Sequence, residues 1–223
     1  MEVIYEDNHL IIVNKNTSEI VQGDKTGDKP LSEIVKEYIK EKYQKPGNVY
    51  LGVIHRLDRP VSGIVVFAKT SKALSRMNKL FREDKVEKKY WAIVGNRPPK
   101  PSDQLVHYLI KNQKQNKSYA YDMLKPESKK AILNYSVIGH SDRYTLLEVD
   151  LQTGRHHQIR TQLSKIGCPI KGDLKYGAPR SNKDGGISLH ARSIAFTHPV
   201  SQEEIFVTAP FPDDPLWSVF KLI

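Results

Sequence analysis

The alternation of apolar and polar positions predicts more strands than helices. Residues 3–13 indicate two short strands joined by a turn at residues 6–8. Residues 63–68 contain an uninterrupted apolar run, which is typical of a strand buried on both faces. The remaining strands are predicted over residues 49–54, 88–95, 105–110, 131–138 and 143–151, with a closing hairpin over 188–210. Polar connections are predicted for residues 96–104 and 112–130.

Helical spacing of apolar residues occurs three times. Residues 31–43 carry it directly after Pro30, and residues 71–83 carry it with Ser71 as the expected N-cap. Residues 156–166 form the third helix, which has an apolar stripe on one side and a glycine at its end. These elements predict a mixed α/β domain around a central, largely antiparallel sheet, with the polar middle segment as an insertion.

Composition narrows the class of protein. A chain of 223 residues can bury a sizeable core, and its single cysteine, Cys168, rules out an intramolecular disulfide and a multi-cysteine metal site. The N-terminal segment has acidic residues early and a short apolar run, unlike a secretory or transit peptide. No stretch approaches membrane-spanning length. We therefore expect a cytoplasmic protein that does not associate with a membrane.

The formal net charge of +10 is concentrated in one segment. Residues 69–130 hold 16 Lys and Arg against 6 Asp and Glu, and the rest of the chain has 19 of each sign. A basic segment of this kind favours a polyanionic partner, although a solvated lysine-rich face would look the same. Aromatic residues that could stack on unpaired bases lie in or near it, namely Tyr90, Trp91, Tyr108, Tyr119 and Tyr121.

A charged cluster directly precedes the buried strand at residues 63–68. It consists of His55, Arg56, Asp58 and Arg59. For an isolated cluster, an ordinary Arg–Asp ion pair at the entrance of a strand would be the default interpretation. A carboxylate on a short loop at the end of a rigid strand is also how many active sites are built. Asp58 is therefore a candidate catalytic group.

A second cluster lies around the helix predicted at residues 156–166. Arg155 and His156 stand at its N-terminal end, and Arg160 is one position away from the buried stripe. An arginine so close to the core needs a carboxylate partner. Asp58 is the candidate partner, with Asp173 and Glu148 as the alternatives, and spacing alone does not choose between them.

The adjacent histidines do not predict a metal site. On a helix, His156 and His157 would diverge by about 100°, and no H-E-x-x-H spacing occurs in the chain. No phosphate-cradling glycine loop or dinucleotide fingerprint occurs either, so no nucleotide cofactor is expected.

The order of motifs resembles the RluA-type pseudouridine synthases. The matching elements run from "YEDNHLIIVNK" through "HRLDRPVSG", "KKYWAIVG" and "TGRHHQIR…GCPIKGDLKYG" to "LHARSIAFTHP" and cover nearly the whole chain. The resemblance implies a single catalytic domain over residues 1–223, of the α+β class, built on a long, curved, mainly antiparallel sheet with flanking helices. It also implies an enzyme, an isomerase that converts uridine in structured RNA to pseudouridine without a metal or organic cofactor. The partner would be ribosomal or transfer RNA.

The resemblance also implies roles for individual residues. Asp58 matches the essential aspartate, Tyr90 the tyrosine that packs on the flipped uracil, and Arg160 the arginine that pairs with the aspartate. Arg56 matches the residue that fills the space left by the flipped uridine. The RNA-binding residues expected on this basis are His55, Arg56, Lys88, Lys89, Arg155 and His156.

Departures from the family pattern leave the RNA target open. Val61 stands where threonine is usual, Asn16 where proline is common, and Gln162 where histidine often occurs. No separate N-terminal RNA-binding domain is expected, so residues 97–130 are candidates for target selection, and we expect a monomer. Two other functions are considered: a catalytically idle RNA-binding relative, and an unrelated hydrolase using Asp58 with a neighbouring histidine.

Overall fold

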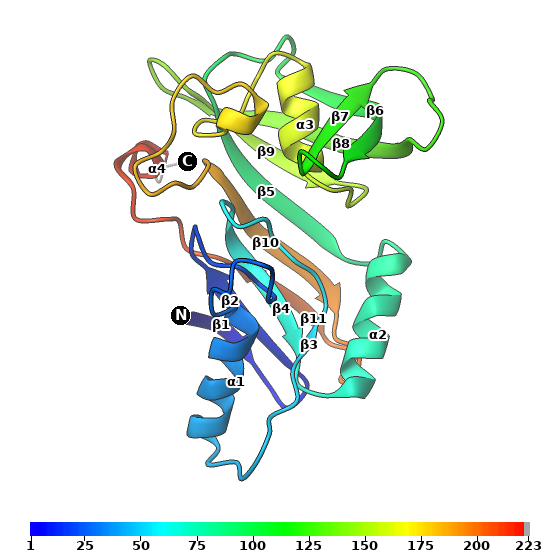
Figure 1. Cartoon of the computed structure of the whole chain (residues 1–223), viewed down its shortest axis with the longest axis vertical. Helices are drawn as coiled ribbons and strands as arrows, with labels where there is room; N and C mark the ends of the chain where they lie inside the picture. Colours follow the sequence, from blue (N-terminus) through cyan, green and yellow to red (C-terminus); the bar gives the residue numbers. More distant parts are fainter. Residues whose placement is uncertain (221–223) are drawn as a thin grey trace. The chain divides into compact units, whose positions relative to one another are not determined.

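The computed structural model describes residues 1–220, and the chain divides into two compact units (Figure 1). The first unit consists of Met1–Glu87 and Ala191–Pro210, and the second of Lys88–His190 with the segment that begins at Phe211. Strands β5 (Glu87–Val94) and β10 (Leu189–Thr197) carry the chain from one unit into the other. The single catalytic domain over residues 1–223 stays a prediction.

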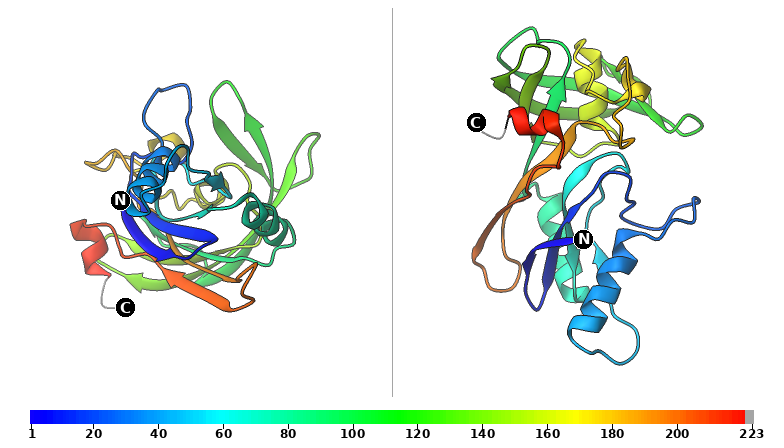
Figure 2. Two further views of the ribbon diagram at one scale, coloured as in Figure 1. Left: turned by 90° about the horizontal axis from the view of Figure 1, so that it is seen from below. Right: turned by 90° about the vertical axis from the view of Figure 1, so that its left-hand side faces the viewer.

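In the first unit, the buried strand β4 (Ser62–Ala68) lies between neighbours on both sides. The strand order is β1-β2-β4-β10, and the short β3 also pairs with β4 while β11 pairs with β10. Every residue of β4 is buried, as its apolar run predicts. The other strands of the unit are β1 (Glu2–Glu6), β2 (Leu10–Lys15), β3 (Gly52–Val53) and β11 (Glu204–Thr208). β11 also packs against β1, so the hairpins at the two ends of the chain lie side by side (Figure 2).

Two helices belong to the first unit. Helix α1 spans Leu31–Lys42, and α2 spans Ser71–Arg82 and packs on β4 with Ala73 and Met77 buried. The N-cap of α2 is Thr70, whose hydroxyl oxygen accepts a hydrogen bond from the Ala73 N–H at 3.1 Å. The prediction of Ser71 as the N-cap was wrong, because the residue before it has the extended backbone that a cap requires.

The second unit contains an antiparallel sheet in the order β5-β9-β8-β6-β7. Its strands after β5 are β6 (Ser102–Asn112), β7 (Lys117–Tyr121), β8 (Lys129–His140) and β9 (Thr145–Leu151). Helix α3 (Gln158–Lys165) packs on β6 and β7 and contacts the 3₁₀ turn η1 (Leu174–Tyr176) (Figure 1). Helix α4 (Pro215–Val219) contributes Trp217 to an apolar cluster with Ile93 and Leu146.

The fold class predicted from the sequence, α+β with a mainly antiparallel sheet, is confirmed. Several elements differ from the prediction. Strand β7 and helix α4 were not predicted, and β3 covers only the end of the strand predicted over residues 49–54. Helix α3 begins at Gln158, because the preceding His157 has a left-handed backbone (φ 53°, ψ 27°).

Candidate active site

Asp58 lies on the loop that enters β4. Its carbonyl accepts a hydrogen bond from the Val61 N–H at 3.0 Å, which closes a turn directly before the strand. The neighbouring Leu57 and Val61 are buried, with 8 % and 3 % of their surfaces exposed, whereas Asp58 is half-buried. The loop is therefore anchored in the core at both sides of the carboxylate.

Lys15, at the end of β2, is hydrogen-bonded to the same loop. Its side chain is fully buried, and its ammonium donates hydrogen bonds to the carbonyls of Asn16 (2.8 Å), Arg59 (3.0 Å) and Val61 (2.7 Å). An ammonium has three N–H groups, so all of them are used on backbone acceptors. Burial lowers the pKa of Lys15 to about 8, against the opposing effect of the Glu19 and Asp58 charges. Lys15 thus holds the backbone on the C-terminal side of Asp58.

Close packing at Gly63 holds the start of β4 in place. Gly63 has φ of +109°, and a Cβ there would lie 2.6 Å from the backbone nitrogen of Ala191 on β10. The residue is thus needed for the close approach of two strands. Its position adds to the rigidity of the segment that follows Asp58.

The other charged residues of the loop have different surroundings. His55 accepts a hydrogen bond at Nε2 from the Val66 N–H (3.1 Å), and its ring stacks on Phe81 with centroids 5.2 Å apart. Arg59 forms ion pairs with Asp28 (2.7 Å) and Asp24 (3.8 Å). Arg56 is exposed. His55 is therefore built into the support of β4, and Arg59 ties the loop to residues 24–28.

Strand β5 places Tyr90 in the second unit, opposite Val149 of β9. Because side chains alternate along a strand, Lys88 and Tyr90 lie on one face of β5 and Lys89 on the other. Lys89 forms an ion pair with Glu148 at 2.8 Å, and the indole N–H of Trp91 donates to the same carboxylate at 3.4 Å. Of the two lysines, Lys88 thus shares the face of Tyr90.

Arg160 is held by a buried ion pair. Its Nε and Nη2 atoms donate to the two carboxylate oxygens of Asp173 at 2.7 and 2.9 Å, and the exposed fractions of the two side chains are 6 % and 1 %. The guanidinium also lies over the ring of Tyr176, 5.0 Å from its centroid. Asp173, one of the three carboxylates that the sequence left open, is therefore a partner of Arg160. Pairing of Arg160 with Asp58 stays a prediction.

The histidine pair before α3 belongs to a hydrogen-bonded network. Because His157 adopts a left-handed backbone, the rings of His156 and His157 stack with centroids 3.8 Å apart, and the divergence expected on a helix does not occur. His156 bonds through Nδ1 to the Ser118 hydroxyl (2.8 Å), and His157 Nδ1 bonds to the Tyr176 hydroxyl (2.9 Å). Burial, with a contribution from the Arg160 charge, lowers the pKa of His157 to about 2, so its ring is neutral.

Arg155 and His156 line a small pocket of about 360 Å³ in the second unit. The Nε of Arg155 donates to the Lys130 carbonyl at 2.9 Å. Two further cations, Lys111 and Lys129, line the same pocket. These residues therefore form a basic surface beside the β6–β7 hairpin, where the sequence predicts RNA contacts.

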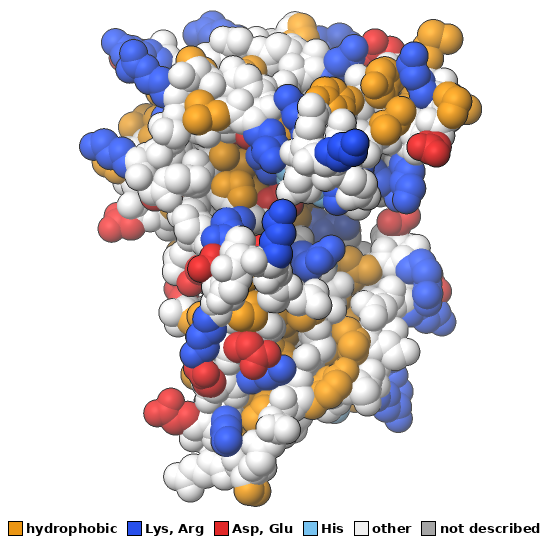
Figure 3. Space-filling view, in the orientation of Figure 1, with side chains coloured by type: hydrophobic (Ala, Val, Ile, Leu, Met, Phe, Trp, Pro, Cys, Tyr) orange, Lys and Arg blue, Asp and Glu red, His pale blue; other side chains and the backbone are white. Residues whose placement is uncertain are grey.

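Several features bear on what the site can hold. Among residues 1–220, no group of three or more His, Cys, Asp or Glu side chains is arranged to bind a metal ion. In the same part of the chain, no helix is both long and apolar enough to cross a membrane. Lys and Arg side chains are more visible than Asp and Glu on the face drawn in Figure 3.

Sequence reasoning missed two residues that position the site. Lys15 follows an apolar strand, and a lysine at such a position is expected to be exposed. Tyr176 is not singled out by the sequence, but its hydroxyl accepts the Ser118 N–H at 2.8 Å and its ring packs against the Arg160 guanidinium. The only sequence signal for Lys15 is its placement after five residues with one polar member, and Tyr176 has no local signal.

Comparison with known proteins assigns the family. Residues 9–165 match the RNA pseudouridylate synthase family. The ribosomal large subunit pseudouridine synthase C of Buchnera aphidicola subsp. Baizongia pistaciae is 32% identical over 216 residues, which are 93% of this chain and 66% of that protein. The tRNA pseudouridine synthase C of Vibrio parahaemolyticus is 28% identical over 231 residues, 96% of this chain and 91% of that protein.

A solved structure supports the fold. The human RNA pseudouridylate synthase domain containing 4 superposes with a TM-score of 0.81 at 23% identity, covering 99% of this chain and 92% of that one. The chain spans about two thirds of the length of the ribosomal relatives it matches. The family and enzyme class predicted from the sequence are confirmed. The chain belongs to the RNA pseudouridylate synthase family.

Proposed function

We propose that this protein isomerises specific uridines of structured ribosomal or transfer RNA to pseudouridine, with Asp58 as the essential aspartate. The observation that carries the proposal is the support of the Asp58 loop. A buried ammonium holds the loop by two of its backbone carbonyls, those of Arg59 and Val61, and the strand that follows is fully buried. A reacting carboxylate has to be held at a fixed position and orientation relative to one atom of a bound nucleotide, and a rigid support of this kind does so.

The reaction conserves all atoms of the uridine. The bond from ribose C1′ to uracil N1 breaks, the base rotates, and a bond from C1′ to C5 forms, while C5 loses a proton and N1 gains one. A carboxylate can serve as a covalent nucleophile or can stabilise a cationic sugar during such a step. Asp58 is assigned this role.

Tyr90 and Arg160 are assigned supporting roles in catalysis. The target base has to leave its stack, at a cost of roughly a few kcal/mol. Stacking on an aromatic ring such as Tyr90 returns about 1–3 kcal/mol. Arg160 is oriented by Asp173 and Tyr176, and a guanidinium has five N–H groups, so it can bind a second carboxylate besides Asp173. The assignment of Asp58 as that second carboxylate is part of the proposal.

RNA binding is assigned to the basic residues predicted from the sequence. Arg56 is exposed beside Asp58, and Arg155 and His156 line the small basic pocket. Lys88 lies on the same face of β5 as Tyr90, and Lys89 lies on the opposite face, paired with Glu148. His55 contributes to RNA binding indirectly, because its hydrogen bond to Val66 supports β4. The proposal also includes one catalytic domain over residues 1–223, a monomer, and a cytoplasmic location.

The test is pseudouridine mapping of total RNA from cells with and without the gene. A site that disappears on deletion should return with the wild-type protein and with Asp142→Asn, an exposed carboxylate used as the matched control, but not with Asp58→Asn. The purified Asp58→Asn protein should keep its melting temperature and RNA affinity. Return of the site with Asp58→Asn would reject the assignment of Asp58, and an unchanged map with a wild-type protein that binds RNA without isomerising it would reject the activity.

A further inference from the structure

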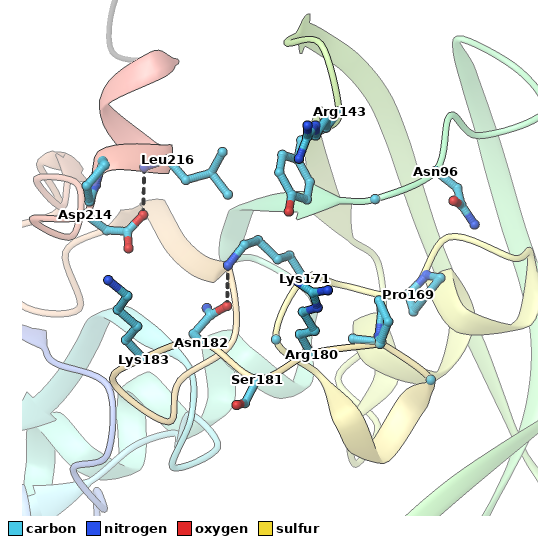
Figure 4. Close-up of a pocket in the computed structure, with 17 residues that line it drawn as sticks. Asn96, Arg143, Pro169, Lys171, Arg180, Ser181, Asn182, Lys183, Asp214 and Leu216 are labelled. Carbon is cyan, nitrogen blue, oxygen red and sulfur yellow. Dashed lines mark hydrogen bonds between the residues drawn. The ribbon is translucent and has the colours of Figure 1, made fainter.

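A second, larger cavity lies in the second unit. Its volume is about 680 Å³, and neither Tyr90 nor Arg160 lines it. Four cationic side chains surround it: Arg143 from the turn between β8 and β9, and Lys171, Arg180 and Lys183 from residues 171–183 (Figure 4). We call this cavity the cationic pocket.

The charges in the cationic pocket are poorly compensated. Within residues 1–220, Arg143, Arg180 and Lys183 have no ion pair with a carboxylate. The one carboxylate that lines the pocket is Asp214, and one of its oxygens accepts the Leu216 N–H at 2.8 Å (Figure 4). Like charges around one space repel each other, and a bound anion relieves that repulsion. The pocket is therefore suited to a ligand with several negative charges.

The base of the pocket is fixed before any ligand binds. The Lys171 N–H donates to the Ile93 carbonyl at 2.9 Å, and the Lys171 carbonyl accepts the Ser188 N–H at 2.8 Å. The Lys171 ammonium donates to the Asn182 side chain at 2.6 Å, which in turn donates to the Ser188 hydroxyl at 3.2 Å. A Cβ at Gly172 would lie 2.7 Å from the Asn182 side chain, so glycine is required for this arrangement. Because these groups are already ordered, binding of a ligand costs less conformational entropy.

We propose that the cationic pocket binds backbone phosphates of the RNA substrate at nucleotides other than the reactive uridine. The inference rests on the proposed function, which supplies a polyanion as substrate. Arginine and lysine are the main phosphate-binding side chains, and an RNA strand presents phosphates in succession, which suits several cations placed around one cavity. Tyr144, Pro179 and Leu216 add apolar surface to the wall, on which a sugar or base can pack.

The test uses the salt dependence of RNA affinity. Each phosphate contact contributes about 0.7–0.9 to the slope of log affinity against log salt. Arg180 and Lys183 are exposed, so the Arg180→Ala/Lys183→Ala variant should fold normally. Its slope should fall by about 1.5, and its loss of affinity between about 50 and about 200 mM KCl should be roughly eightfold smaller than in the wild type. Fluorescence anisotropy with a fluorescein-labelled RNA hairpin measures both.

The matched control removes two cations from the first unit. Lys40 on α1 and Lys72 on α2 are exposed, and the Lys40→Ala/Lys72→Ala variant has the same net charge as the pocket variant. It should keep the wild-type slope. An unchanged slope in the pocket variant, or an equal decrease in both variants, would overturn the inference.

Free phosphate compounds are the other source of the same chemistry. Inorganic pyrophosphate should compete weakly with the hairpin, because it offers fewer charges. Tight pyrophosphate binding that is lost in the pocket variant, together with an unchanged RNA slope, would assign the pocket to a free anion and overturn the RNA inference. The salt-dependence comparison does not depend on catalysis. If the wild-type protein made no pseudouridine, the proposed function would be rejected, but the comparison of the slopes would still test RNA binding by the pocket.

Discussion

The buried pair of Arg160 and Asp173 allows a quantitative prediction. Asp173→Asn keeps the shape of the side chain and removes the carboxylate charge that faces the guanidinium. The two side chains are 6 % and 1 % exposed and share two hydrogen bonds of 2.7 and 2.9 Å. Removing one partner of such a pair costs about 3–5 kcal/mol, because the remaining charge stays buried without its counter-charge. A Coulomb estimate at ~4 Å with an effective dielectric constant of ~20 gives about 4 kcal/mol.

The assay is urea unfolding together with thermal unfolding of the wild type, Asp173→Asn, Arg160→Met and the double variant. For a chain of this size, the single change should lower the melting temperature by roughly 6–20 °C. In the double variant the second change should cost much less than it does alone, since the stranded charge has also been removed. Glu33→Gln breaks an exposed pair with Lys36 (2.8 Å) and should cost no more than about 0.5 kcal/mol. Losses below about 1 kcal/mol in both single variants, or additive losses in the double variant, would refute the reasoning.

Two further predictions concern the support of the Asp58 loop. Because burial lowers the pKa of Lys15 from 10.5 to about 8, the unfolded chain binds more protons between these pH values, and the free energy of unfolding should rise as pH increases through this window. Urea unfolding at a series of pH values should show this rise in the wild type and not in Lys15→Met. The variant should also lose isomerase activity. A rise of equal size in the variant would contradict the assignment of this pH dependence to Lys15. Gly63→Ala should destabilise the protein by about 2–5 kcal/mol, since the residue has positive φ and a Cβ would collide with the Ala191 backbone. Gly23→Ala, where a Cβ meets nothing within 4 Å, is the control, and similar melting temperatures for the two variants would contradict the prediction.

The sequence predicted those parts of the fold that follow from local patterns. Strand β4 and helices α1 and α2 have clear periodicity, and the structure contains all three. Strand β7 could not be predicted in this way, because the burial of Ser118 depends on distant partners. Its N–H donates to the Tyr176 hydroxyl 58 residues away, and its hydroxyl bonds to His156. A serine between lysine and tyrosine has no local signature of a buried position.

The same limit applies to the candidate site. The position of Asp58 directly before a buried strand could be predicted, because the apolar run and the charged loop are adjacent in sequence. The partner of Arg160 was not readable, since three carboxylates satisfied the spacing and only the three-dimensional arrangement brings Asp173 to both nitrogens. Lys15 was not predicted because its acceptors at residues 59 and 61 are more than forty positions away.

The discontinuous first unit has a consequence for biosynthesis. Strand β4 pairs with β10, and β11 pairs with β10, so this unit needs residues from both ends of the chain. On a translating ribosome, β4 would emerge long before its partner strand and would present an apolar, unpaired edge in the meantime. Contacts over such sequence separations slow folding and expose nascent chains to aggregation. Pairing of β10 and β11 is thus the closing step in folding of the first unit, and a chain truncated before β10 would be a substrate for chaperones or proteases.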